Sequence, residues 1–98
     1  MSLNNYAGKR KLVKELGELY RYYFSDLKDI ELKKYRKGNY EHEFIVLTWN
    51  NGGISTANNN CNSLSATARN VARMLDGGVY ENLNLYEEIM KSDEWEEL

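Results

Sequence analysis

Hydrophobic residues near the start of the chain recur with the period of an α-helix. Leu12, Leu16, Leu19 and Tyr23 follow one another at spacings of four, three and four. Further apolar residues fill the neighbouring row, so the stripe is wide, as in helices that pack on a sheet. The pattern predicts a helix from Tyr6 to Phe24.

Gly17 lies inside this predicted helix. A glycine there costs about 1 kcal/mol relative to alanine. We expect another backbone to approach the helix closely at this position.

The pattern changes to a strand-like alternation from Asp29 onward. Ile30 and Leu32 share one face, whereas Tyr35 falls on the opposite one. Either a bulge near Lys33-Lys34 reconciles these positions, or the strand buries little after Leu32.

Tyr40 to Trp49 is the strongest strand signal, and Gly38-Asn39 before it is typical of a turn. Both faces of this strand are apolar, with Phe44 and Val46 pointing one way and Ile45, Leu47 and Trp49 the other. The strand is therefore expected to be central. One helical layer covers one face, so the second face needs another helix, the tail or a partner subunit.

Turn and cap signals divide the rest of the chain. They predict a hairpin turn at Asn50–Gly53, a third strand at Ile54–Ala57, a helix capped by Ser63 that runs to Leu75, a helix stop at Asp76–Gly78, and a last helix at Leu85–Lys91. The predicted fold class is α+β, with an N-terminal helix, a three-stranded antiparallel meander and one or two C-terminal helices.

The length of 98 residues suits one domain, residues 1–98, with fraying expected at residues 1–4 and 93–98. One cysteine, Cys61, excludes an internal disulfide, and His42 is the single histidine. We expect no metal and no cofactor. No apolar run has the roughly 20 residues of a membrane span, so we expect a cytoplasmic protein with no membrane partner.

The net charge of −2 conceals a polarity along the chain. Residues 1–50 hold ten basic and seven acidic residues, whereas residues 51–98 hold three and eight. Acidic residues concentrate in Asp93–Glu97. Abundant asparagine and the absence of proline are typical of low-GC bacterial or phage genes.

Candidate catalytic groups are few. His42 lies between Glu41 and Glu43, but strand alternation puts it on the opposite side from both. Cys61 precedes a predicted helix, a position that can lower a thiol pKa, but no base accompanies it in a motif. We therefore predict no catalytic residues and no enzymatic activity.

Basic residues with tyrosines between them provide a candidate nucleic-acid surface. The candidate contacts are Lys9, Arg10, Lys11, Lys14, Lys33, Lys34, Arg36 and Lys37. The element order resembles the double-stranded RNA-binding domain, and residues 68–73 are similar to its alanine-rich second helix. That family places lysines at the start of this helix, where residues 63–67 here are uncharged.

The acidic C-terminal half instead favours a protein partner. The candidate interface residues are Tyr35, Tyr40, Trp49, Trp95, Glu94, Glu96 and Glu97. The element order, the Asn-Gly turn and the acidic bias also resemble small phage anti-CRISPR proteins, which implies a DNA-mimic inhibitor.

Eight tyrosines and two tryptophans are many for this length, and such residues favour interfaces. A homodimer that covers the second face of the sheet is therefore a further hypothesis. The leading hypothesis is a small accessory protein, bacterial or encoded by a phage or mobile element, that binds a protein partner. Nucleic-acid binding and DNA mimicry are the alternatives.

Overall fold

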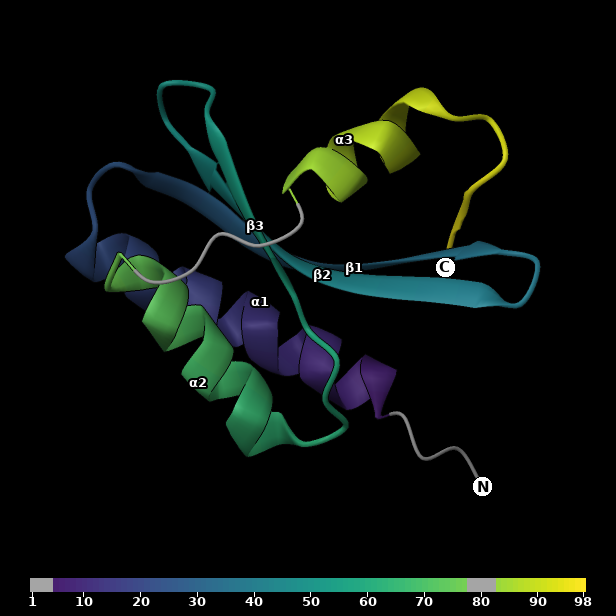
Figure 1. Ribbon diagram of the computed structural model, residues 1–98. Helices are drawn as coiled ribbons and strands as arrows, with labels where there is room; N and C mark the ends of the chain where they lie inside the picture. The colour runs from purple at the N-terminus through teal and green to yellow at the C-terminus, as the bar shows by residue number, and fades with distance from the viewer. Residues whose placement is uncertain (1–4, 78–82) are drawn as a thin grey trace.

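The structure is a computed structural model that describes residues 5–77 and 83–98. Three helices and four strands follow one another in these residues. They are α1 (Tyr6–Tyr23), β1 (Leu27–Lys37), β2 (Tyr40–Trp49), β3 (Ile54–Asn58), α2 (Leu64–Leu75), α3 (Leu83–Lys91) and β4 (Glu96–Glu97) (Figure 1). No helix in this part of the chain is long and apolar enough to cross a membrane.

The predicted α+β class and antiparallel sheet are confirmed. The strands lie in the order β3-β2-β1-β4, and each neighbouring pair is antiparallel. The prediction of three strands missed β4, because its two residues lack any alternation of apolar and polar positions. Gly38 and Gly52 have positive φ angles, 59° and 89°, which explains why the hairpin turns contain glycine.

The central strand β2 is covered on both faces. Ile45 and Leu47 belong to a core beneath α1 and α2, whereas Phe44 and Val46 belong to a second core beneath α3 (Figure 1). Trp95, from the tail, packs against the second core. The last helix and the tail therefore cover the second face of this strand. The sequence had left another helix, the tail and a partner subunit as alternatives.

The register of β1 corrects the expectation of a bulge near Lys33-Lys34. Pairing with β2 is regular from Asp29 to Lys37, and the irregularity lies between Leu27 and Asp29. Tyr35 needs no bulge to be buried, because it faces the second core while Ile30 and Leu32 face the first. The strand therefore buries residues along both faces.

Gly17 is buried where α1 crosses β1. A Cβ atom at this position would lie 3.3 Å from the Cβ of Ile30 and 3.5 Å from its backbone N and O atoms. The expected close approach of a second backbone is confirmed.

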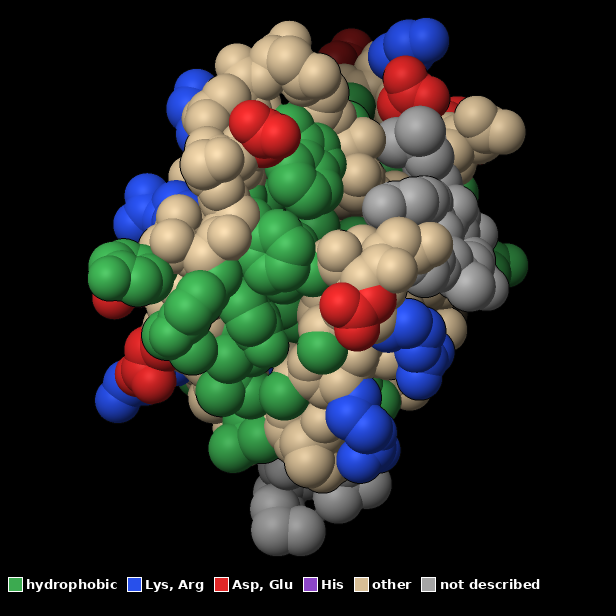
Figure 2. Space-filling view, turned by 90° about the vertical axis from the view of Figure 1, so that its left-hand side faces the viewer, with side chains coloured by type: hydrophobic (Ala, Val, Ile, Leu, Met, Phe, Trp, Pro, Cys, Tyr) green, Lys and Arg blue, Asp and Glu red, His purple; other side chains and the backbone are tan. Residues whose placement is uncertain are grey.

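The opposite, outer side of the α1 and α2 layer carries further hydrophobic side chains (Figure 2).

Tyr35 makes the second core sensitive to alkaline pH. Tyr35 is 3% exposed, and burial, together with Tyr86 and Glu97, raises the pKa of its phenol above the ordinary value of 10.0. The neutral phenol is thus favoured in the folded state. Its contribution to stability is present below pH 10 and is lost as the pH rises above that value.

We predict that Tyr35→Phe reduces the loss of stability between pH 9 and pH 11.5, since phenylalanine has no proton to lose. The measurement is the urea midpoint at each pH. Tyr22→Phe is the matched control, because Tyr22 is 84% exposed, and it should keep the wild-type pH dependence. An unchanged pH dependence in Tyr35→Phe would contradict this account of the second core.

Candidate functional site

The C-terminal segment returns to the sheet after α3. The backbone pairs Glu97 with Tyr35 and Glu96 with Arg36, and the amide of Leu98 donates to the carbonyl of Lys34 at 2.9 Å. These contacts hold the acidic residues at the edge of β1, although fraying was expected there.

Trp95 anchors the segment through its side chain. Its ring centroid lies 5.4 Å from that of His42, and the Nζ of Lys37 lies 5.9 Å from the same ring. Lys37 also forms an ion pair of 3.0 Å with Glu94. The anchor gives the neighbouring carboxylates a fixed location relative to β1 and β2.

Six exposed carboxylates lie on α3 and the segment that follows it. They are Glu87, Glu88, Asp93, Glu94, Glu96 and Glu97, and we call this group the acidic face. Within the described residues, Glu94 alone among them forms an ion pair. Since Lys91 is the one basic residue between Leu83 and Leu98, the acidic face has a strong negative potential.

The basic candidates of β1 are mostly neutralised by acidic neighbours. Lys33 pairs with Glu31 at 3.4 Å, and Lys34 and Arg36 both pair with Glu41. The Arg36 hydrogen bonds, supported by Lys34, lower the pKa of Glu41 and keep it ionised. Together with the Lys37–Glu94 pair, these contacts give each basic candidate of this strand an acidic partner, with Lys34 and Arg36 sharing the one carboxylate of Glu41.

The basic candidates of α1 divide into two groups. Lys9 is fully buried, so it cannot contact nucleic acid. Arg10, Lys11 and Lys14 are exposed and have no ion pair with any described residue. They are the part of the predicted nucleic-acid surface that the structure leaves available.

The aromatic candidates for a protein interface lie in different surroundings. Tyr35 is buried in the second core, so its side chain is not available to a protein interface. Trp49 is half-buried and its Nε1 donates to the Oγ of Ser55, whereas Tyr40 is 71% exposed at the β1–β2 turn. The structure thus brings Trp95 together with Glu94, Glu96 and Glu97, and Trp49 lies apart, against the first core.

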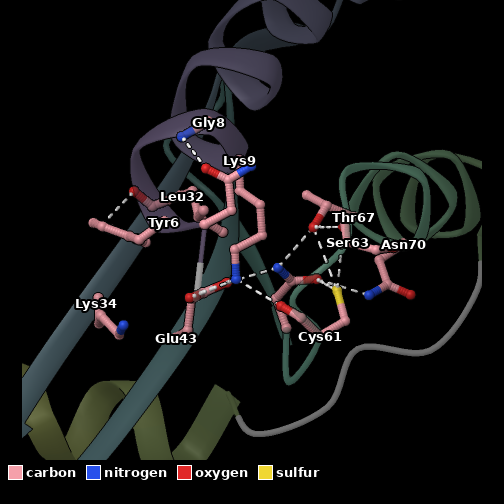
Figure 3. Close-up of polar contacts among 12 residues, drawn as sticks. Tyr6, Gly8, Lys9, Leu32, Lys34, Glu43, Cys61, Ser63, Thr67 and Asn70 are labelled. Atoms are coloured by element: carbon pink, nitrogen blue, oxygen red, sulfur yellow. Dashed lines mark hydrogen bonds and ion pairs between the residues drawn. The ribbon is translucent and has the colours of Figure 1, made fainter. Parts of the chain in front are cut away.

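The buried Lys9 belongs to a polar network that the sequence analysis missed (Figure 3). Its Nζ donates to both carboxylate oxygens of Glu43, at 3.0 and 2.8 Å, and to the carbonyl of Cys61 at 2.6 Å. Lys9, Val13 and Gly17 are the buried residues of α1. A lysine four residues before a buried valine, on the same helix face, was the available signal.

Asn59 extends this network to α2. Its amide donates to Glu43 at 2.7 Å and to the Oγ1 of Thr67 at 3.1 Å, and its carbonyl oxygen accepts from Asn70 and from the Cys61 thiol. Each charged group thereby has hydrogen-bonding partners, as a buried ion pair requires.

A surface pocket of about 230 Å³ opens beside the network. Its charged groups are already engaged, because Lys9 pairs with Glu43 and Lys34 with Glu41. The His42 side chain does not line this pocket. It points to the other side of the sheet, where it contacts Phe44 and Trp95. The two candidate catalytic residues, His42 and Cys61, therefore do not come together.

Comparisons with known proteins add no identity to this geometry: no family model, curated protein or solved structure matches the chain.

We predict that Glu43→Gln destabilises the protein by about 3–5 kcal/mol, since the Lys9 ammonium would remain buried without a counter-charge. Glu31→Gln is the control, because Glu31 is half exposed and its pair with Lys33 should contribute under about 1 kcal/mol. Urea unfolding of both variants provides the measurement. Equal losses in the two variants would contradict the structural importance of the buried pair.

Proposed function

We propose that the protein acts by binding a protein partner that presents a basic surface to the acidic face. The observation that carries this proposal is the set of six exposed carboxylates, of which Glu94 alone has an ion-pair partner among the described residues. Clustered unpaired carboxylates attract cationic surfaces and speed association with them.

The arrangement of the backbone supports the same proposal. β4 pairs with β1, and Trp95 packs against His42 and the second core. The backbone that carries the carboxylates of the tail is therefore held on β1 before a partner arrives, which reduces the entropy lost on binding. A partner would meet a surface that is already formed.

The proposed role is binding without catalysis. His42 contacts the second core, whereas Cys61 belongs to the polar network, in which Lys9 and Glu43 are paired with each other. We place this role in the cytoplasm of a bacterium or in a phage-infected cell, where a lone thiol such as Cys61 remains reduced.

Nucleic-acid binding is the second candidate, and Arg10, Lys11 and Lys14 favour it. They are exposed along α1 and have no described ion-pair partner. The ion pairs of the basic side chains of β1 and the sequence pI of about 5.4 count against nucleic-acid binding. We therefore rank it below a protein partner.

DNA mimicry is a special case of the first proposal. Its partner would be a nucleic-acid-binding protein whose basic groove accepts carboxylates in place of phosphates. The resemblance in element order to anti-CRISPR proteins and the exposed acids of α3 and β4 support this form.

The test compares two probes by fluorescence anisotropy, a nine-residue arginine peptide and a DNA duplex, each across a salt series. We expect the protein to bind the peptide more tightly than the duplex. Glu88→Gln/Glu96→Gln/Glu97→Gln should weaken peptide binding at least about tenfold, since each lost charge contact is worth a fraction of a kcal/mol to about 1 kcal/mol.

The matched control is Glu15→Gln/Glu18→Gln/Asp26→Asn, which changes the net charge equally but leaves the acidic face intact. An equal loss in both triple variants would overturn the proposal. Tighter binding of the duplex, lost in Arg10→Gln/Lys11→Gln/Lys14→Gln, would favour the nucleic-acid candidate. Inhibition of an RNA-guided DNA nuclease by the wild type but not by the acidic-face variant would support DNA mimicry.

A further inference from the structure

A large hydrophobic surface lies on the outer side of α1 and α2, away from the sheet. Leu19, Tyr22 and Tyr23 of α1 are 51%, 84% and 69% exposed, and Leu64 of α2 is 43% exposed. Figure 2 shows hydrophobic side chains forming a continuous surface with charged side chains on both sides of it. Leu16 of α1 is half-buried and packs against the first core. We call the exposed set, Leu19, Tyr22, Tyr23 and Leu64, the outer apolar surface.

Exposure of this apolar surface to water is unfavourable in free energy when the molecule is isolated. Exposed apolar residues that are scattered singly are ordinary, whereas contiguous ones mark interaction sites. Tyr22 and Tyr23 pack edge to face, with ring centroids 5.3 Å apart, so the two rings form one contiguous aromatic surface. Tyrosine side chains provide a large contact area at a small entropic cost, because they have two χ angles.

Charged residues on the two margins of this surface have opposite net charge. Helical spacing places exposed Lys11, Glu15 and Glu18 on the α1 margin and exposed Arg69, Arg73 and Asp76 on the α2 margin. The other exposed charged residues of α1, which are Arg10, Lys14 and Arg21, lie on its β1 side. None of them forms an ion pair with another described residue. The α1 margin is thus net negative and the α2 margin net positive.

We propose that the protein forms a symmetric dimer in which the outer apolar surface of one copy packs against the same surface of a second copy. A twofold axis along the seam between α1 and α2 places α1 of each copy on α2 of the other. The two apolar seams then meet, and each negative margin faces the positive margin of the partner. The charge pattern is therefore self-complementary.

This dimer differs from the one that the sequence suggested. The sequence hypothesis used a partner subunit to cover the second face of the sheet, which α3 and Trp95 cover instead. The outer apolar surface lies on the opposite side of the sheet from α3 and Trp95, since α1 and α2 pack on the first core and α3 packs on the second. Dimerisation would leave the proposed partner-binding surface free on both copies.

Light scattering across a concentration series from about 1 µM to about 1 mM tests the proposal. We expect the mass to rise from 11.5 kDa toward twice that value. Leu19→Lys/Tyr23→Lys should weaken dimerisation at least about tenfold, because it places charge in the centre of the apolar contact. Tyr40→Lys, at the exposed β1–β2 turn, is the control and should leave dimerisation unchanged.

Charge reversal provides a sharper test of the twofold arrangement. Glu15→Arg/Glu18→Arg makes both margins positive, and Arg69→Glu/Arg73→Glu makes both negative. Each variant alone should remain monomeric, because like charges then face each other. An equimolar mixture should form a heterodimer, since both margins then meet opposite charge.

Several outcomes would overturn the proposal. A wild-type protein that stays monomeric at the highest concentration has no such dimer. A dimer that survives Leu19→Lys/Tyr23→Lys uses a different interface. Charge-reversed variants that fold, as shown by circular dichroism, but do not associate when mixed would rule out the arrangement of α1 on α2.

Discussion

The buried ion pair between Lys9 and Glu43 is the contact on which the arrangement of the domain depends. Lys9 comes from the first turns of α1, and Glu43 from the central strand β2. Their side chains are 1% and 6% exposed, so both charges have lost most of their hydration. A pair in this position is stable only while every partner stays in place.

The same pair organises the segment between β3 and α2. The Cys61 carbonyl accepts from Lys9, and the Asn59 amide donates to Glu43, so a loop rich in asparagine acquires one conformation. Thr67 and Asn70 then connect Asn59 to α2. Because α1 and α2 are fixed on one face of β2, the opposite face is left for α3 and the C-terminal segment, and the acidic face follows from this division.

Much of the fold could be predicted from periodicity. The apolar residues on both faces of Tyr40–Trp49 identified a central strand, and Gly17 identified the close crossing of α1 and β1. The missed features depend on pairing between distant residues. β4 is held on the sheet by the contacts of Trp95 with His42 and Lys37. The polar network depends on the contact between Lys9 and Glu43, which are 34 residues apart in the sequence. The acidic composition was visible in the sequence, whereas the pairing of Lys33, Lys34, Arg36 and Lys37 with acids required the register of β1.

A double-mutant cycle on Lys9 and Glu43 tests the central claim most directly. The free energy of unfolding is measured for the wild type, Lys9→Met, Glu43→Leu and the double variant. The account predicts a coupling of at least about 2 kcal/mol and a double variant that is more stable than either single variant, because it leaves no lone buried charge. Losses that simply add, with a coupling near zero, would show that the domain does not depend on this pair.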